Sequence, residues 1–226
     1  PSVAVKQELL QKGLIDAERV VVIAEGCEER FNSQKDPQES ATLAKKYSLP
    51  AEYILFVGNL DPRKNLAGLL HAFARLEKRD LRLVVAGSPG LRSESLVAVV
   101  HELRLQERVQ FTGFVDDDDL PGLYRGAQLF VFPSLQEGFG LPVLEALRCG
   151  TPVVASESSS IPEVAGGAAL LVDPRSPEAL ASGIRRLLED TELAARLRRE
   201  GIARAQQFTW QKTANRTLEL YAELLA

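Results

Sequence analysis

Two glutamates eight residues apart, Glu137 and Glu145, flank the short sequence Gly-Phe-Gly and the start of a helical pattern. The two glycines permit backbone angles that other residues avoid, which predicts a tight turn directly after Glu137. From Leu141 onward the apolar spacing is typical of a buried helix, which should end at Gly150. One carboxylate therefore belongs to a loop, and the other belongs to the first turns of a helix.

Backbone N–H groups at such a helix start form a natural seat for a phosphate oxygen, here between Gly138 and Leu141. Arg63 and Lys64 follow another strand-like run that ends in Gly58, and they could close on the same phosphate. If a diphosphate lies between the two glutamates, each carboxylate can accept hydrogen bonds from a sugar. The pattern therefore predicts a nucleotide sugar as ligand, with the ribose at Glu145 and the transferred hexose at Glu137.

The elements that must position these residues are apolar runs separated by helical patterns. We expect strands at 53–60, 81–87, 109–114, 129–134, 152–156 and 169–173. Buried strands that alternate with helices indicate a parallel, doubly wound α/β sheet covered on both faces. In such sheets, ligands bind beyond the carboxyl ends of the strands. The turns at 86–90 and 113–115 and the candidate residues above all fall at these ends.

The two ends of the chain differ from this alternating part. After Pro177 the pattern is helical only, which predicts a C-terminal helical tail containing Trp210 and Tyr221, with some exposed apolar surface. Residues 1–50 contain a helix-like piece, a strand-like run at 19–24 and a polar connection at 32–40. We interpret 1–50 as a linker and the end of a missing N-terminal half, and 51–226 as the ligand-binding domain.

The composition limits the classes of protein to which the chain could belong. With 27 basic and 31 acidic residues the net charge is −4, which argues against a general nucleic-acid or anionic-membrane surface. Two distant cysteines, Cys27 and Cys149, give neither a disulfide framework nor zinc spacing and favour a cytoplasmic setting. No apolar run approaches the ~20 residues of a membrane span, and no secretion signal begins the chain.

At the paired glutamates the sequence resembles the retaining glycosyltransferases of family 4, through the motif EGFGLPVLE. The resemblance extends over nearly the whole chain through FVGNLDPRKNLAGLLHAF, VQFTGFVDDDDLPGLYRGAQLFVFPS, CGTPVVAS and IPEVAGGAALLVDP. It implies the Rossmann-like, six-stranded C-terminal half of a GT-B fold, with the acceptor-binding half absent. It also implies a metal-independent transfer of a hexosyl group, such as mannosyl, from a UDP-, GDP- or ADP-hexose with retention of configuration.

The resemblance also implies roles for single residues. Arg63, Lys64 and Glu137 match the catalytic positions, and Glu137 would orient the sugar without acting as a covalent nucleophile. The donor-binding positions are Gly58, Arg63, Lys64, Val115, Glu137, Gly138, Phe139, Gly140, Leu141 and Glu145, of which Val115 meets the nucleobase through its backbone. No cofactor is implied, and peripheral membrane association would come from the missing half.

Several alternatives remain open. The glutamates and cations could be ordinary surface charges, and the run Asp116–Asp119 could bind a metal instead of flanking a helix start. His71 and His101 fall within helical patterns and are expected to be structural. The chain could be a non-catalytic nucleotide-sugar sensor or subunit. A NAD-binding module is disfavoured because no G-x-G-x-x-G follows the first strand.

Overall fold

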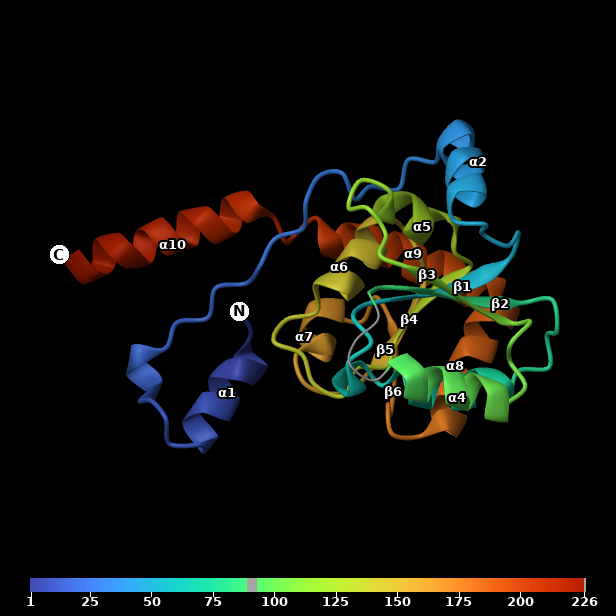
Figure 1. Cartoon of the computed structure of the whole chain (residues 1–226). Coiled ribbons are helices and arrows are strands. Elements are labelled where there is room, and N and C mark those ends of the chain that lie inside the picture. Colours follow the sequence, from blue (N-terminus) through green and yellow to red (C-terminus); the bar gives the residue numbers. More distant parts are fainter. Residues whose placement is uncertain (89–92, 226) are drawn as a thin grey trace.

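The computed structural model describes residues 1–88 and 93–225 and contains a six-stranded, fully parallel sheet (Figure 1). The strands are β1 (Tyr53–Val57), β2 (Arg82–Ala86), β3 (Val109–Gly113), β4 (Leu129–Phe132), β5 (Val153–Ser156) and β6 (Leu170–Val172). All six predicted strands are confirmed, each slightly shorter than its apolar run. The last residues of the predicted turn at 86–90 lie outside the described residues.

The strand order β3-β2-β1-β4-β5-β6 is that of a doubly wound sheet. The four strands β1, β2, β4 and β5 are buried almost throughout, which explains why they read as continuous apolar runs and not as alternating ones. The chain reverses its direction of winding between β1 and β4. In sheets of this kind, ligands bind at such a switch point, beyond the carboxyl ends of the strands. The loops that follow β1 and β4 are the ones that carry Arg63, Lys64 and Glu137.

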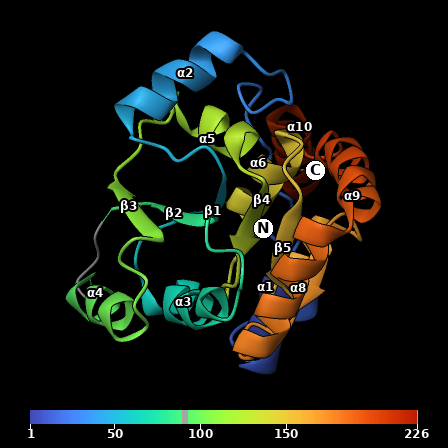
Figure 2. The ribbon, with the colours of Figure 1, turned by 90° about the vertical axis from the view of Figure 1, so that its right-hand side faces the viewer.

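Helices cover both faces of the sheet (Figure 2). One face is covered by α3 (Leu66–Ala74), α4 (Ser93–Glu102) and α8 (Pro177–Glu189), and the other by α5 (Leu120–Gly126), α6 (Leu141–Arg148) and α7 (Ile161–Ala165). The helix α9 (Thr191–Ala205) packs against both α6 and α8. The doubly wound α/β prediction is therefore confirmed, and α6 begins at Leu141 as expected.

The first 50 residues correct two predictions. The run at 19–24 forms no strand: its carboxyl end lies against the C-terminal helix, where the Ala24 carbonyl accepts a 2.8 Å hydrogen bond from Thr213 Oγ1. A β-branched run becomes a strand only beside a partner strand, and residues 1–88 and 93–225 provide none for this run. The segment 32–40 is not all connection, because Asp36 caps α2 (Pro37–Lys46) through the Gln38 N–H at 2.8 Å.

The core of the domain begins before residue 51. Cys27, Phe31 and Leu43 are buried in the same apolar cluster as β1 and α5. The helix α1 (Val3–Gln11) buries no side chain within its own bounds. The division of the chain at residue 50 stays a prediction, but α2 and the segment before it pack as part of the compact domain.

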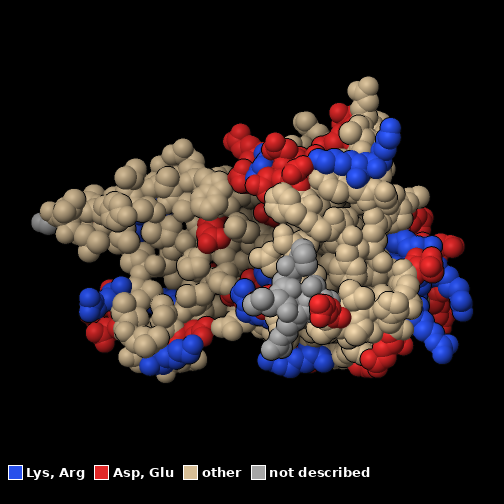
Figure 3. All heavy atoms as spheres, in the orientation of Figure 1, with Lys and Arg blue, Asp and Glu red and all other residues tan. Residues whose placement is uncertain are grey.

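The helical tail ends in α10 (Trp210–Leu225), which extends away from the sheet (Figure 1). Trp210, Leu218 and Tyr221 are exposed, as expected for this tail. On the face seen in Figure 3 the helix carries almost no charged side chains. Among the described residues, no helix combines the length and the apolar character needed to cross a membrane.

Candidate functional site

The loop after β1 holds Arg63 and Lys64 in a single 3₁₀ turn, Pro62–Lys64. The Asp61 carboxylate starts this turn by accepting a 2.7 Å hydrogen bond from the Arg63 N–H. Asn65 ends it in the left-handed conformation, with φ of 55°, and its amide donates to the carbonyls of Pro133 and Pro174. The two cations are therefore presented by a short loop that is hydrogen-bonded to the ends of two other strands.

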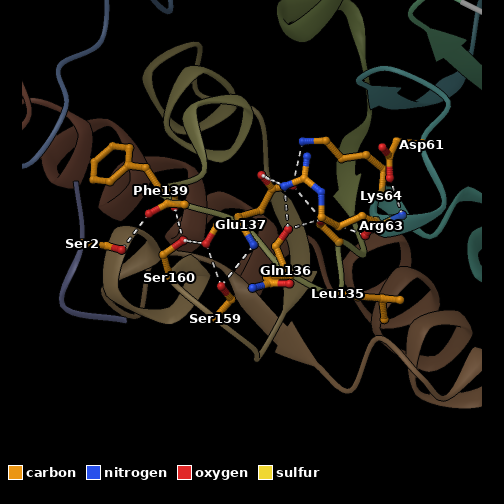
Figure 4. Close-up of polar contacts among 12 residues, drawn as sticks. Ser2, Asp61, Arg63, Lys64, Leu135, Gln136, Glu137, Phe139, Ser159 and Ser160 are labelled. Carbon is orange, nitrogen blue, oxygen red and sulfur yellow. Dashed lines mark hydrogen bonds and ion pairs between the residues drawn. The ribbon is translucent and has the colours of Figure 1, made fainter. Parts of the chain in front are cut away.

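The loop after β4 is joined to the first loop by two hydrogen bonds. The Leu135 N–H donates to the Arg63 carbonyl oxygen at 2.8 Å, and Arg63 Nη1 donates to the Gln136 carbonyl oxygen at 3.2 Å. Neighbouring parallel strands end at the same edge of a sheet, so their loops can pair in this way. The two loops at the switch point form one hydrogen-bonded unit (Figure 4).

Glu137 lies at the centre of this unit. Its Oε1 atom accepts from Lys64 Nζ at 2.6 Å and from the Ser134 hydroxyl at 2.6 Å, and its Oε2 atom lies 3.7 Å from Arg63 Nη1. Glu137 is 9% exposed and the Lys64 side chain 14%, and Lys64 Nζ also lies 4.9 Å from the centre of the Phe132 ring. The three residues predicted to act together are thus in contact, and two cations face one carboxylate.

The backbone of 137–141 is held through its carbonyl groups. The hydroxyl groups of Ser159, Ser2 and Ser160 donate at 2.7 Å to the carbonyl oxygens of Glu137, Gly138 and Phe139, respectively. The N–H groups of residues 138–141 have no acceptor within 1–88 or 93–225. These four donors remain open at the start of α6, where the helix dipole favours an anion.

The two glycines of this loop differ in conformation. Gly140 has φ of +117°, and a Cβ added there would lie 2.7 Å from Ile161 Cδ1. Gly138 does not adopt a left-handed φ, and the nearest atom to an added Cβ would be Pro1 Cγ at 4.0 Å. The prediction of unusual backbone angles is therefore right for Gly140 and wrong for Gly138, because one left-handed residue is enough to turn the chain into α6.

Glu145 lies on α6, and no hydrogen bond or ion pair between the described residues joins it to the Glu137 cluster. The Tyr124 hydroxyl donates to its Oε2 atom at 2.9 Å. Burial raises the pKa of Glu145 to about 7, although the hydrogen bond from Tyr124 and the charge of Arg30 both oppose this rise. The second carboxylate is therefore half-buried and close to its titration point at neutral pH.

The remaining residues singled out from the sequence lie on loops, in the acidic run and on helices. Gly58 has φ of +149° beside the Lys64 side chain, and Val115 is buried after β3. In the acidic run, Asp116 and Asp119 both pair with Lys46, and Asp118 pairs with Arg30. His71 and His101 lie on helices as expected, and Cys149 is buried at the end of α6.

Hydroxyl groups that were not predicted from the sequence hold the site residues in place. Ser134 and Ser159 bind the side chain and the backbone of Glu137, and Tyr124 binds Glu145. Ser134 directly follows a predicted strand and could have been singled out by its position. Nothing in the spacing of Ser159 or Tyr124 pointed to a glutamate 22 or 21 residues away.

The sequence and the fold of this chain are similar to those of known proteins. O-antigen chain mannosyltransferase B of Escherichia coli is 34% identical over 220 residues, which cover 96% of this chain and 58% of that protein. A glycosyltransferase structure from Rickettsia africae superposes with a TM-score of 0.91 at 25% identity, covering 99% of this chain and 62% of that one. Anabaena HepE in complex with UDP and glucose superposes with a TM-score of 0.88 at 25% identity. The superposition covers 98% of this chain and 61% of that one.

The chain spans little more than half the length of these three proteins. Their similarity runs through the sheet, both loops of the site and the helical tail. Residues 39–204 match the family described as glycosyl transferases group 1. Because this match covers most of the sequence, the chain belongs to the glycosyl transferases group 1 family.

Proposed function

We propose that the chain is the donor-binding half of a retaining hexosyltransferase that uses a nucleotide-diphosphate sugar. The observation that carries the proposal is the cluster of Glu137, Lys64 and Arg63 at the switch point, beside four open N–H groups of residues 138–141. A cluster of two cations and one carboxylate suits a ligand that carries both phosphate and sugar hydroxyl groups. Mannosyl is the hexosyl group that we propose first, since the Escherichia coli relative is named a mannosyltransferase.

Each group then has one task. Arg63, Lys64 and the N–H groups of 138–141 bind the diphosphate and stabilise the charge that develops when it leaves. Glu137 orients the hexose through its hydroxyl groups, Glu145 accepts from the ribose, and the backbone at Val115 lies against the base. The two cations take the electrostatic role that a metal ion fills in other sugar transferases, so we propose that binding needs no metal.

The test of the proposal is a calorimetric titration of residues 1–226 with UDP-, GDP-, ADP- and CMP-sugars, with and without EDTA. We expect one of them to bind, with the same affinity in EDTA. Lys64→Ala should weaken that binding, while Lys45→Ala, a change at an exposed lysine of α2, should not. Failure of all four ligands would contradict the proposal, and affinity lost in EDTA but restored by Mg²⁺ or Mn²⁺ would assign a metal to Asp116–Asp119.

The cellular setting stays a prediction. We propose a cytoplasmic protein, with an acceptor-binding half as its partner and contact with the inner membrane face through that half. The competing possibility is a nucleotide-sugar sensor or subunit without transferase activity, which binds the same ligand. Donor binding therefore cannot separate the two, and an activity measurement on a longer chain must do so.

A further inference from the structure

Tyr124 is a residue of α5 and is buried against Phe130 of β4 and Glu145 of α6. It has no solvent exposure, and its ring lies edge-on to Phe130 at 5.1 Å and to Phe31 at 6.1 Å between ring centres. Its carbonyl oxygen accepts a 2.7 Å hydrogen bond from Thr151 Oγ1. Both ends of the residue are therefore constrained, and the ring has little freedom to rotate.

The hydroxyl group at the tip of this ring has one partner among the described residues, which is Oε2 of Glu145 at 2.9 Å. Burial and the nearby Glu145 charge raise the pKa of Tyr124 well above 10, so the hydroxyl stays protonated and donates. The other oxygen, Oε1, accepts no hydrogen bond from residues 1–88 or 93–225. Tyr124 thus anchors one oxygen of the carboxylate and leaves the other as an open acceptor.

The hydrogen bond from Tyr124 strongly affects the pKa of Glu145, because few other groups favour the ionised carboxylate. Burial is the main cause of its raised pKa, and the Tyr124 hydrogen bond is the largest effect in the opposite direction. The other titratable or charged groups that face it are Arg30, Glu28, Asp117, Cys27 and Cys149. Arg30 also pairs with three other carboxylates, those of Glu28, Asp117 and Asp118, so its charge does not act on Glu145 alone.

We propose that Tyr124 is a positioning residue for the donor nucleotide, which holds Glu145 with its free oxygen directed to the ribose hydroxyl groups. The proposal rests on the proposed function, because it takes Glu145 as the ribose acceptor. If Tyr124 has only a structural role, its replacement should weaken the binding of all nucleotides equally. If Tyr124 positions Glu145, its replacement should weaken only the binding of ligands that carry a 2′,3′-diol.

The experiment compares Tyr124→Phe with the wild-type chain in titrations with UDP, GDP and ADP and their 2′,3′-dideoxy forms, at several pH values. For the ribonucleotide that binds, we expect about 3- to 10-fold weaker binding in the variant at pH 8. Binding of the dideoxy form should change by less than about twofold. The matched control is Tyr53→Phe, because that hydroxyl is also buried but donates to the Leu123 carbonyl.

The pH dependence gives a readout that a change in packing would not move. Wild-type affinity for the ribonucleotide should fall as pH drops through about 7, where Glu145 takes up a proton. In Tyr124→Phe the carboxylate loses a donor, so the same fall should occur at higher pH. The dideoxy nucleotide carries the same phosphate groups, so a fall caused by phosphate protonation should appear with it too, but this fall should not be displaced in Tyr124→Phe.

Unfolding of Tyr124→Phe would not end the test. Phe31→Leu keeps the hydroxyl but loosens the ring, and it should weaken the ribonucleotide more than the dideoxy form. Two results would overturn the positioning role. One is an equal loss of affinity for the ribonucleotide and the dideoxy form, and the other is a fall of affinity in Tyr124→Phe at the same pH as in the wild-type chain. If no nucleotide binds to the wild-type chain at any pH, the proposed function fails instead.

Discussion

At the scale of single residues, the two glutamates should make different contributions to donor binding. Glu145→Ala should weaken the nucleoside diphosphate and the sugar nucleotide alike, by ~1.5–3 kcal/mol, since both ligands carry the ribose. Glu137→Ala should weaken only the sugar nucleotide. Because Glu137 pairs with Lys64 at 2.6 Å, its removal frees a cation for the phosphate, and the diphosphate should bind at least as well as before.

Calorimetry with both ligands on both variants measures this difference. Thermal unfolding run in parallel shows whether each variant is folded. Equal losses of the two ligands in Glu137→Ala would mean that this carboxylate does not face the hexose. In that case Glu137 would act on phosphate binding instead, by holding Lys64 in position.

The raised pKa of Glu145 also predicts how stability depends on pH. In the folded chain its pKa is about 7, against an ordinary value of 4.5. Between these values the folded state binds more protons than the unfolded state, so this residue lowers the free energy of unfolding as pH rises from about 4.5 to about 7. Glu145→Gln removes this loss, so the variant should gain more stability over wild type at pH 8 than at pH 5.

Melting temperatures at the two pH values, with the exposed Glu29→Gln as control, test this expectation. The same gain at both pH values would show that Glu145 is not desolvated. The nucleotide should bind more weakly to Glu145→Gln although the variant is more stable. The two outcomes together would mean that the wild-type residue exchanges stability for ligand affinity, as is common at functional sites.

At the scale of elements, the turn into α6 depends on one glycine and not on two. Gly140→Ala places a side chain at φ of +117° and close to Ile161, and it should cost about 1–3 kcal/mol of stability. Gly138→Ala has open space and no left-handed φ, so its stability should change by about 0.5 kcal/mol or less. Urea unfolding of the two variants gives the comparison. A similar loss at both positions would contradict the described turn.

The elements also show what could be predicted from the sequence. Strands such as β1 and β4 were recognisable because parallel, doubly covered strands are apolar without alternation. Since the carboxyl ends of parallel strands share one edge, the meeting of Lys64 with Glu137 followed from the order of elements. The run at 19–24 has the same β-branched composition, but strand formation needs a neighbouring strand, and this is a tertiary property.

The hydroxyl partners were beyond prediction for a similar reason. Ser159 and Tyr124 reach their glutamates across the fold, through α5, α6 and the loop after β5. The hydroxyl group of a serine or tyrosine can donate to many acceptors, so the residue type alone does not identify its partner. The charged residues of the site could therefore be predicted, whereas the groups that hold them required the structure.

At the scale of the whole molecule, the residues that we propose to bind the donor lie together at one edge of the sheet. Among the described residues, the proposed donor contacts lie on the loops at the carboxyl edge of one sheet and on α6, and neither His71 nor His101 lies at that edge. The tail exposes Trp210, Leu218 and Tyr221 along α10. Similar glycosyltransferases are longer, with 58% and 62% of their length covered by this chain. These observations agree with a cleft that needs a second half.

We therefore predict that residues 1–226 bind a nucleotide-sugar donor but transfer nothing to an acceptor. Transfer requires the acceptor to be held in near-attack geometry, and holding both reactants accounts for a large part of enzymatic rate enhancement. A single wall can bind the donor but cannot fix the acceptor against it. The measurement is a radiolabelled-donor assay on the chain alone and on a longer chain that includes an acceptor-binding half. Product with retained anomeric configuration is expected only from the longer chain. Robust transfer by residues 1–226 alone would contradict the prediction that transfer needs an acceptor-binding half. Donor binding without transfer in the longer chain would favour a nucleotide-sugar sensor.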